Sequence, residues 1–350
     1  MNMKDIMTEM SNTKASDVFI VAGLPIAYRK NNNITNYNEN NLTPDDTKDF
    51  LTEIYQMADK RDINKLKENG DDDFSFAIPG VARFRVSAYM QRGSMAAVLR
   101  VIAFELPDYQ SLRIPKEIIE LSDNSSGMVL VTGPAGSGKS TTLACMIDKI
   151  NKSYRKHIIT IEDPIEYLHR HNKSIVSQRE LNLDTKSFAS SLRATLRQSP
   201  DVILLGEMRD YETISIAMTA AETGHLLLSS LHTIGASNTI DRIIDVFPAN
   251  QQHQIAVQLS CTLNAVVSQQ LLPTMDGGIV PAFEIMRVTP AIRNMIRDGK
   301  IFQLDGTIFS NNGKNGMLSM DNSIQQLYHQ NIISRETALM FATNPDRISI

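Results

Sequence analysis

Short, continuous apolar runs alternate with amphipathic stretches through the middle of the chain. A run of four to six apolar residues is typical of a strand buried on both faces, whereas apolar residues three and four apart are typical of a helix. Strands are predicted at residues 128–131, 157–161, 202–205 and 226–231. Helices are predicted after the first of these strands and at residues 188–197 and 212–222. This alternation predicts a doubly wound α/β core, with helices on both faces of a mainly parallel sheet.

The two ends of the chain follow other patterns. Near the N-terminus, a helical stretch that starts at Pro44 with Thr43 as its cap is surrounded by strand-like runs at residues 18–21, 74–78, 83–89 and 97–102. From residue 239 onward the pattern is rich in helix, most clearly at residues 251–272. With 350 residues, two domains are expected. We predict an α+β domain over residues 1–110, a linker to about residue 122, and a second domain over residues 123–350.

The segment after the first core strand carries a phosphate-binding pattern. It has the spacing G-x-x-x-x-G-K-[ST], filled by Gly133, Pro134, Ala135, Gly136, Ser137, Gly138, Lys139 and Ser140. Glycines let backbone N–H groups turn toward a phosphate chain, and the following helix adds its positive end. Lys139 would reach the β and γ phosphates, Ser140 would help hold Mg²⁺, and Thr141 continues the first helical turn. A chance glycine turn is the alternative. Because strand, loop and helix occur together, we predict a nucleotide site that binds ATP with Mg²⁺.

Acidic residues follow two of the predicted strands. Glu162, Asp163 and Glu166 come at and just beyond one strand end, and Glu207 follows another strand after a glycine. The carboxyl ends of parallel strands are where ligands bind in open α/β sheets. ATP hydrolysis requires a carboxylate that orients and deprotonates water, and further carboxylate around the metal. These acids are candidates for both roles, although Asp163 before a proline could equally shape a turn.

Arginines and histidines supply further candidates. Arg193 and Arg197 lie four apart on a predicted helix and share one face, where they suit phosphate recognition or simply a solvated surface. His225 and His232 lie at the two ends of the strand predicted at residues 226–231. A histidine at a strand end is more often structural than catalytic, and no metal-ligand spacing accompanies these two. From the residues alone, the structural interpretation of both histidines is favoured.

Composition excludes several classes of protein. Apolar residues make up 42% of the chain and charged residues 21%, as in an ordinary globular protein. The formal net charge is −4 without a basic block, which argues against nucleic acid as a partner. Cys145 and Cys261 form no C-x-x-C pair, which favours a reducing compartment and no cysteine zinc site. No apolar run approaches the length of a membrane span or a signal peptide, so a cytoplasmic protein without a transmembrane segment is expected.

These motifs together resemble the type II/IV secretion ATPase superfamily, and most closely its type IV pilus retraction branch. The resemblance rests on the phosphate loop and on three further segments: an aspartate box at residues 161–167, a second acidic motif at 201–210 and a histidine box at 223–233. The segment 289–297 resembles the tail motif of retraction ATPases. Within the phosphate loop, Ala135 stands where the family usually has threonine. The similarity spans nearly the whole chain.

The resemblance implies a fold, an assembly and a role for each candidate. It implies a PAS-like first domain, a RecA-like P-loop ATPase core and a ring-shaped homo-hexamer. It makes Glu166 the general base and Glu207 the metal-side glutamate, with Lys139, His225 and His232 also catalytic. The residues expected near Mg²⁺ are Ser140, Glu207, Glu162 and Asp163. The arginines expected to face phosphate are Arg85, Arg100, Arg193 and Arg197.

The expected function is that of a cytoplasmic, Mg²⁺-dependent ATPase at the inner face of the membrane, which drives pilus retraction and twitching motility through a membrane-embedded platform protein. The direction of movement rests on the resemblance, because the same phosphate site can drive either direction. A pilus assembly or secretion ATPase is one alternative. Another is an accessory ring subunit that binds ATP and modulates a paralogous motor. A motor acting on nucleic acid is disfavoured by the mild acidity.

Overall fold

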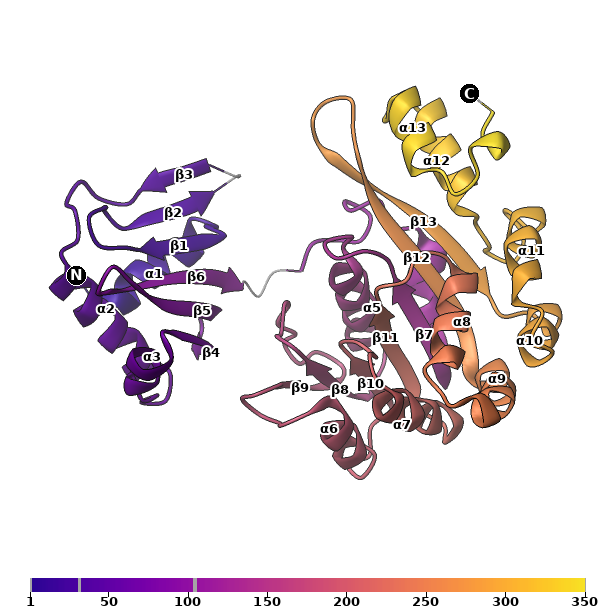
Figure 1. Ribbon diagram of the computed structural model, residues 1–350, viewed down its shortest axis with the longest axis horizontal. Coiled ribbons are helices and arrows are strands. Elements are labelled where there is room, and N and C mark those ends of the chain that lie inside the picture. Colours follow the sequence, from indigo (N-terminus) through magenta and orange to yellow (C-terminus); the bar gives the residue numbers. More distant parts are fainter. Residues whose placement is uncertain (1, 31–32, 103–105, 350) are drawn as a thin grey trace. The chain divides into compact units, whose positions relative to one another are not determined.

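The chain divides into two compact units (Figure 1). A computed structural model describes residues 2–30, 33–102 and 106–349. The first unit comprises Met1–Leu106 with the short segment Glu166–Leu168, and the second comprises Pro107–Ile165 with His169–Ile350. No helix among these described residues is long and apolar enough to cross a membrane.

The first unit is an antiparallel sheet packed on helices. Its strands, in the order β3-β2-β1-β6-β5-β4, are Asn33–Asn36, Ala27–Lys30, Asp17–Ile20, Ser94–Ile102, Ala82–Gln91 and Asp71–Ile78. Its helices are α1 Met3–Asn12, α2 Pro44–Met57 and α3 Asn64–Asn69. The predicted start of α2 is confirmed, because Thr43 and Asp46 form a capping box there. The α+β character predicted for this part of the chain is therefore confirmed.

The second unit is built on a seven-stranded sheet of order β13-β12-β7-β11-β10-β8-β9. The strands are β7 Gly127–Thr132, β8 His157–Glu162, β9 Ile175–Glu180, β10 Val202–Leu205, β11 Leu226–Leu231, β12 Leu263–Pro273 and β13 Ile279–Arg287. All pair in parallel except β13, which pairs antiparallel with β12 at one edge. The helices around the core are α4 Lys116–Ile119, α5 Lys139–Ser153, α6 Phe188–Thr195, α7 Tyr211–Glu222, α8 Ala236–Asp245 and α9 Ala249–Thr262. A tail of helices follows: α10 Pro290–Arg297, α11 Leu304–Ser310, α12 Met320–His329 and α13 Arg335–Phe341.

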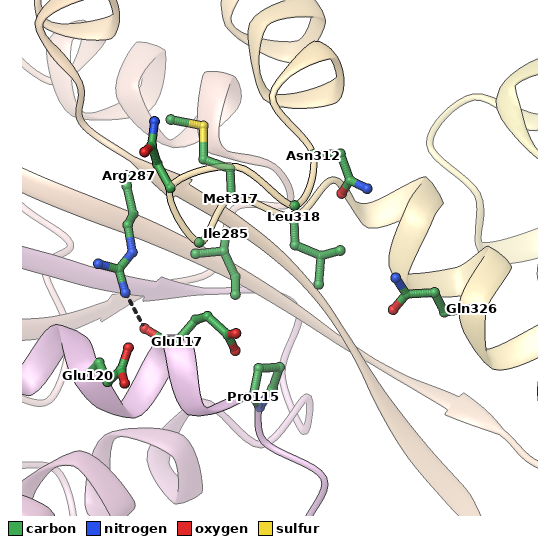
Figure 2. A pocket seen from close by; sticks show the side chains of 12 residues that line it. Pro115, Glu117, Glu120, Ile285, Arg287, Asn312, Met317, Leu318 and Gln326 are labelled. Atoms are coloured by element: carbon green, nitrogen blue, oxygen red, sulfur yellow. Dashed lines mark hydrogen bonds between the residues drawn. The ribbon is translucent and has the colours of Figure 1, made fainter.

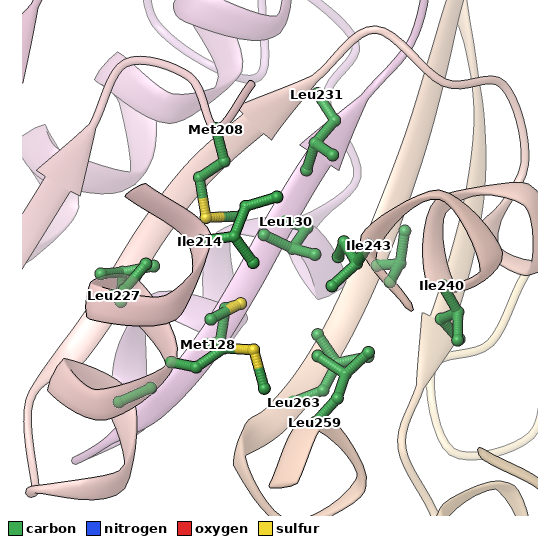
Figure 3. Packing of buried hydrophobic residues seen from close by; sticks show 14 of the residues in the cluster. Met128, Leu130, Met208, Ile214, Leu227, Leu231, Ile240, Ile243, Leu259 and Leu263 are labelled. Carbon is green, nitrogen blue, oxygen red and sulfur yellow. The ribbon is translucent and has the colours of Figure 1, made fainter. Parts of the chain in front are cut away.

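Helices cover this sheet on both faces, as the continuous apolar strands predict. Alternate residues of a strand point to opposite faces, and β7 shows both. Met128 and Leu130 belong to a core with residues of α7, α8 and α9, which Figure 3 shows, whereas Val129 and Val131 pack in a second core with residues of α5. The predicted doubly wound α/β core is confirmed. Apolar residues of the predicted linker, including Ile118, also pack in the second core.

The predicted helix at residues 251–272 is wrong in its second half. Helix α9 ends at Thr262, and the chain continues directly as β12 from Leu263. This segment pairs with β7 on one side and with β13 on the other, which satisfies its backbone groups in the sheet. Its spacing of apolar residues suits a helix, but the sheet buries Ala265, Val266 and Val267 completely, and such tertiary pairing overrides local preference. Strand β9 is also absent from the prediction, because it is a half-buried edge strand without an apolar run.

Candidate active site

Four parallel strands bring the predicted motifs of the second unit to one edge of the sheet. Strand β7 ends at Thr132 and leads into the phosphate loop, and β8 ends at Glu162. Strand β10 leads to Glu207, and β11 leads to His232. These strands are direct neighbours in the order β7-β11-β10-β8. The carboxyl edge of the sheet therefore gathers groups that are distant in sequence, as the position of ligand sites in open α/β sheets requires.

The phosphate loop has the backbone of an anion cradle. Gly136 and Gly138 take φ values of +76° and +87°, which side chains other than glycine rarely adopt, and α5 begins immediately afterwards at Lys139. The Lys139 Nζ donates to the carbonyl oxygens of Gly133 at 2.9 Å and Pro134 at 2.8 Å, so the ammonium group arches over the loop. A loop of this form with a cation above it fits a polyphosphate chain.

Glu207 is held in place by its neighbours at the same edge. The Arg209 Nε donates to Glu207 Oε2 at 2.5 Å, and the His232 Nε2 lies 3.3 Å from the same oxygen. The preceding Gly206 donates its N–H to the carbonyl of Ile161 at 2.8 Å, which ties β10 to the end of β8. The structure thus joins the second acidic motif to the histidine box through the contact between Glu207 and His232.

The acids after β8 are arranged differently from one another. The Glu162 carboxylate is half-buried and accepts hydrogen bonds from Thr160 Oγ1 at 2.6 Å and Gln178 Nε2 at 3.2 Å. Asp163 is exposed and precedes a cis proline, and Glu166 is exposed on the segment that groups with the first unit. Among the described residues, no cluster of three His, Cys, Asp or Glu side chains could hold a metal ion alone. Mg²⁺ in nucleotide sites takes one or two protein ligands together with phosphates and water, so this donor set fits it.

The predicted arginines fall into two groups. Arg193 pairs with Glu212 at 2.6 Å on the exposed surface between α6 and α7, and Arg197 is exposed just beyond α6. In the first unit, Arg85 and Arg100 stand opposite each other on β5 and β6. Both line a pocket of about 270 Å³ whose walls also include two carboxylates, Asp17 and Asp73. Two guanidinium groups and two carboxylates therefore lie together on one surface of the first unit.

His225 lies at the opposite edge of the sheet from His232. It precedes β11, and its Nδ1 lies 2.9 Å from the carbonyl oxygen of Ala220 at the end of α7. A strand rises about 3.3 Å per residue, so β11 separates the two histidines by roughly 20 Å. Within one chain the structure therefore brings His232, but not His225, to the phosphate-loop edge.

One wall of the site could not be found from the sequence. A pocket of about 280 Å³ adjoins Gly138 and Thr141 of the phosphate loop. It is lined mainly by residues of the linker and the β12–β13 hairpin, among them Leu112, Arg113, Ile114, Leu271 and Ile279. A mostly apolar pocket directly beside a phosphate cradle has the chemistry to receive a nucleotide base. No local motif marks these residues, because two distant segments form the pocket only after folding.

A larger cavity lies elsewhere in the second unit. Its volume is about 730 Å³, and it is formed by α4, β13 and the loop before α12 (Figure 2). Arg287, one of the residues that line it, donates from Nη2 to the carbonyl oxygen of Glu117 at 2.8 Å. None of the predicted site residues lines it. Cavity size therefore does not mark the candidate site in this fold, whereas the convergence of phosphate loop, acid and histidine does.

A buried acid anchors the loop that follows His232. Glu284 on β13 accepts the N–H of Ala236 at 2.8 Å at the start of α8, and Ser268 on β12 accepts the N–H of Gly235 at 2.9 Å. Burial raises the pKa of Glu284 to about 7, with help from the charges of Asp305 and Asp321 and against the Ala236 hydrogen bond. The histidine-box loop is thus attached to the β12–β13 hairpin by a carboxyl group that titrates near neutral pH.

We expect this carboxyl group to make the stability of the protein depend on pH. Because its pKa is raised on folding, its stabilising contribution is present below about pH 4.5 and is lost as the pH rises through about 7. Glu284→Gln keeps an acceptor for Ala236 but cannot ionise. Urea unfolding at pH 5 and pH 8 should show a loss for the parent that exceeds that of the variant by up to roughly 3 kcal/mol. Glu336→Gln, at an exposed position on α13, is the control. Equal losses for all three proteins would contradict the expectation.

Known proteins share this architecture along the full chain. The family described as type II/IV secretion system protein matches residues 1–331. A relative from Pseudomonas aeruginosa, the type IV pilus retractation ATPase PilT, is 43% identical over 346 residues, which is 99% of either chain. A twitching motility protein from Neisseria gonorrhoeae is 49% identical over 284 residues, which cover 81% of this chain and 76% of the relative.

A solved structure agrees with these relatives in three dimensions. It is the pilus retraction motor PilT with bound ADP, which superposes with a TM-score of 0.89 at 45% identity. The match covers 99% of this chain and 98% of that one. The mixed α/β fold is therefore that of the secretion ATPases. The chain belongs to the type II/IV secretion system protein family.

Proposed function

We propose that the chain is a motor ATPase that uses ATP hydrolysis to retract type IV pili, and thereby supports twitching motility. The observation that carries the proposal is the shared edge of the sheet, where the phosphate loop lies beside the Glu207–His232 pair. The resemblance to retraction ATPases along the whole chain supports the direction of movement.

We assign each candidate residue a task in hydrolysis. Lys139 leaves the loop carbonyls and binds the β and γ phosphates, where its charge offsets the charge that develops during phosphoryl transfer. Glu166 orients the attacking water and accepts its proton. Glu207, in contact with Arg209 and His232, faces the metal side. Mg²⁺, held by Ser140 and Glu207 with Glu162 and Asp163 nearby, would supply further positive charge at the phosphates.

The assembly is also part of the proposal. We place the protein in a homo-hexamer at the cytoplasmic face of the membrane, beneath a membrane-embedded platform protein. Arg85, Arg100, Arg193 and Arg197 are exposed in the described structure, which suits a role at sites completed by neighbouring subunits. His225, at the far edge of the sheet, has no task at the phosphates of its own subunit and would act only on another surface.

Two measurements test the proposal. The purified protein should release phosphate from ATP in the presence of Mg²⁺, and removal of Mg²⁺ with a chelator should abolish this release. A protein that binds ATP without turnover would instead be an accessory ring subunit. Deletion of the coding sequence in the host should leave persistent, unretracted pili and no twitching. Cells without pili would point to an assembly ATPase.

A further inference from the structure

Gln269 on β12 touches both ends of the phosphate loop. Strand β7 stops at Thr132, whose partner on β12 is Ser268, and β12 continues for five more residues to Pro273. Gln269 is therefore the first residue of β12 beyond the end of β7, and it stands where the chain turns away as the loop. Its side chain is buried, with 3% exposed. A buried amide at this place requires partners in the loop.

The main chain of Gln269 packs against the first glycine of the loop. A Cβ atom placed on Gly133 would lie 2.2 Å from the Gln269 carbonyl oxygen, closer than any real side-chain contact. The backbone of β12 thus lies directly against the loop, and only glycine permits this approach. The requirement for glycine at position 133 comes from β12, which is more than a hundred residues away in sequence.

The side chain of Gln269 reaches the last glycine and the first turn of α5. Thr142 Oγ1, fully buried, donates to Gln269 Oε1 at 2.7 Å, and this bond orients the amide. The Nε2 group then faces Gly138, where a Cβ atom would lie 2.8 Å from it. Gln269 also lines the pocket beside Thr141. The NH₂ group therefore presents its positive edge behind the backbone that cradles phosphate.

We propose that Gln269 is a positioning residue for the nucleotide: it braces Gly133, Gly138 and Thr142 as one unit, and its amide, oriented by Thr142, adds donor character behind the phosphate cradle. The inference rests on the proposed function, since it concerns the same ATP site. It predicts that the bracing acts mainly on nucleotide affinity, because the contacts described for Gln269 are with the phosphate loop and the first turn of α5.

The decisive variant is Gln269→Glu, which keeps the size of the side chain and still accepts from Thr142. Its second oxygen replaces the NH₂ donor with negative charge near the phosphates, so the Kd for a fluorescent ADP analogue and the KM for ATP should rise roughly tenfold, with a smaller change in kcat. Burial of the new carboxyl group near phosphate should raise its pKa, so the ratio of variant Kd to parent Kd should fall as the pH is lowered from 8 to 5. Gln270→Glu, which adds the same charge one residue along β12 on its other face, should bind the analogue like the parent.

A second pair of variants provides an independent test if circular dichroism shows that Gln269→Glu folds poorly. Thr142→Val removes the orienting hydroxyl and should raise the Kd several-fold when it is introduced into the parent. Introduced into Gln269→Met, the same substitution should not raise the Kd further, because Thr142 acts through the amide. Parent-like affinity in Gln269→Glu, or additive effects of Thr142→Val and Gln269→Met on the Kd, would overturn the inference. In either case, ATP hydrolysis by the parent would still support the proposed motor function. If the parent binds no nucleotide analogue, the proposed function fails as well.

Discussion

Replacement of Lys139 by alanine is expected to lower kcat/KM for ATP by roughly 10³-fold, the scale found when one preorganised group that stabilises developing charge is removed. Lys139 is buried, with 8% of the residue exposed, and its ammonium group donates to the loop carbonyls of Gly133 and Pro134. Nothing else among the described contacts of the loop supplies a positive charge at this position. The variant should therefore lose both phosphate binding and stabilisation of the transition state.

Steady-state phosphate release and titration with a fluorescent ADP analogue measure the two losses separately. Lys152→Ala is a matched control, because it removes a lysine from the same helix whose side chain is exposed and pairs with Asp148. Circular dichroism establishes that each variant is folded. A rate of ATP hydrolysis by Lys139→Ala within a few-fold of the parent rate would show that the phosphate loop does not contribute to hydrolysis.

Glutamine in place of either candidate glutamate is expected to reduce kcat by roughly 10²-fold to 10⁴-fold, for two different reasons. Glu166→Gln removes a base, so the rate should fall at every Mg²⁺ concentration. Glu207→Gln weakens the binding of Mg²⁺, so the Mg²⁺ concentration for half-maximal activity should rise as well. Glutamine can still accept from Arg209, which limits structural change at Glu207.

Binding of the ADP analogue should survive in both variants, since neither side chain belongs to the loop. Glu222→Gln, at the exposed end of α7, provides a control with the same chemical change. A variant of Glu166 that hydrolyses ATP as fast as the parent would show that another group acts as the base. An unchanged Mg²⁺ requirement in Glu207→Gln would show that Glu207 does not contribute to Mg²⁺ binding.

The sequence allowed prediction of those features that depend on neighbouring residues. To recognise the phosphate loop, one needs only a strand, the glycine spacing and a helix start, and all three are contiguous from Met128 onward. The capped start of α2 and the core strands β8, β10 and β11 follow in the same way from local pattern. The strand that comes after α9 could not be recognised, because its partners β7 and β13 decide its conformation.

For the site, sequence alone determined which chemical groups exist and at which strand ends they lie. Tertiary structure decided which of them meet: β10 and β11, as neighbours, join Glu207 to His232, whereas the length of β11 carries His225 to the far edge. It also decided the walls of the site, formed by the linker and by Gln269 from β12. The physical reason is that glycine spacing and apolar runs act over a few residues, while pairing between strands is set by burial across the whole sheet.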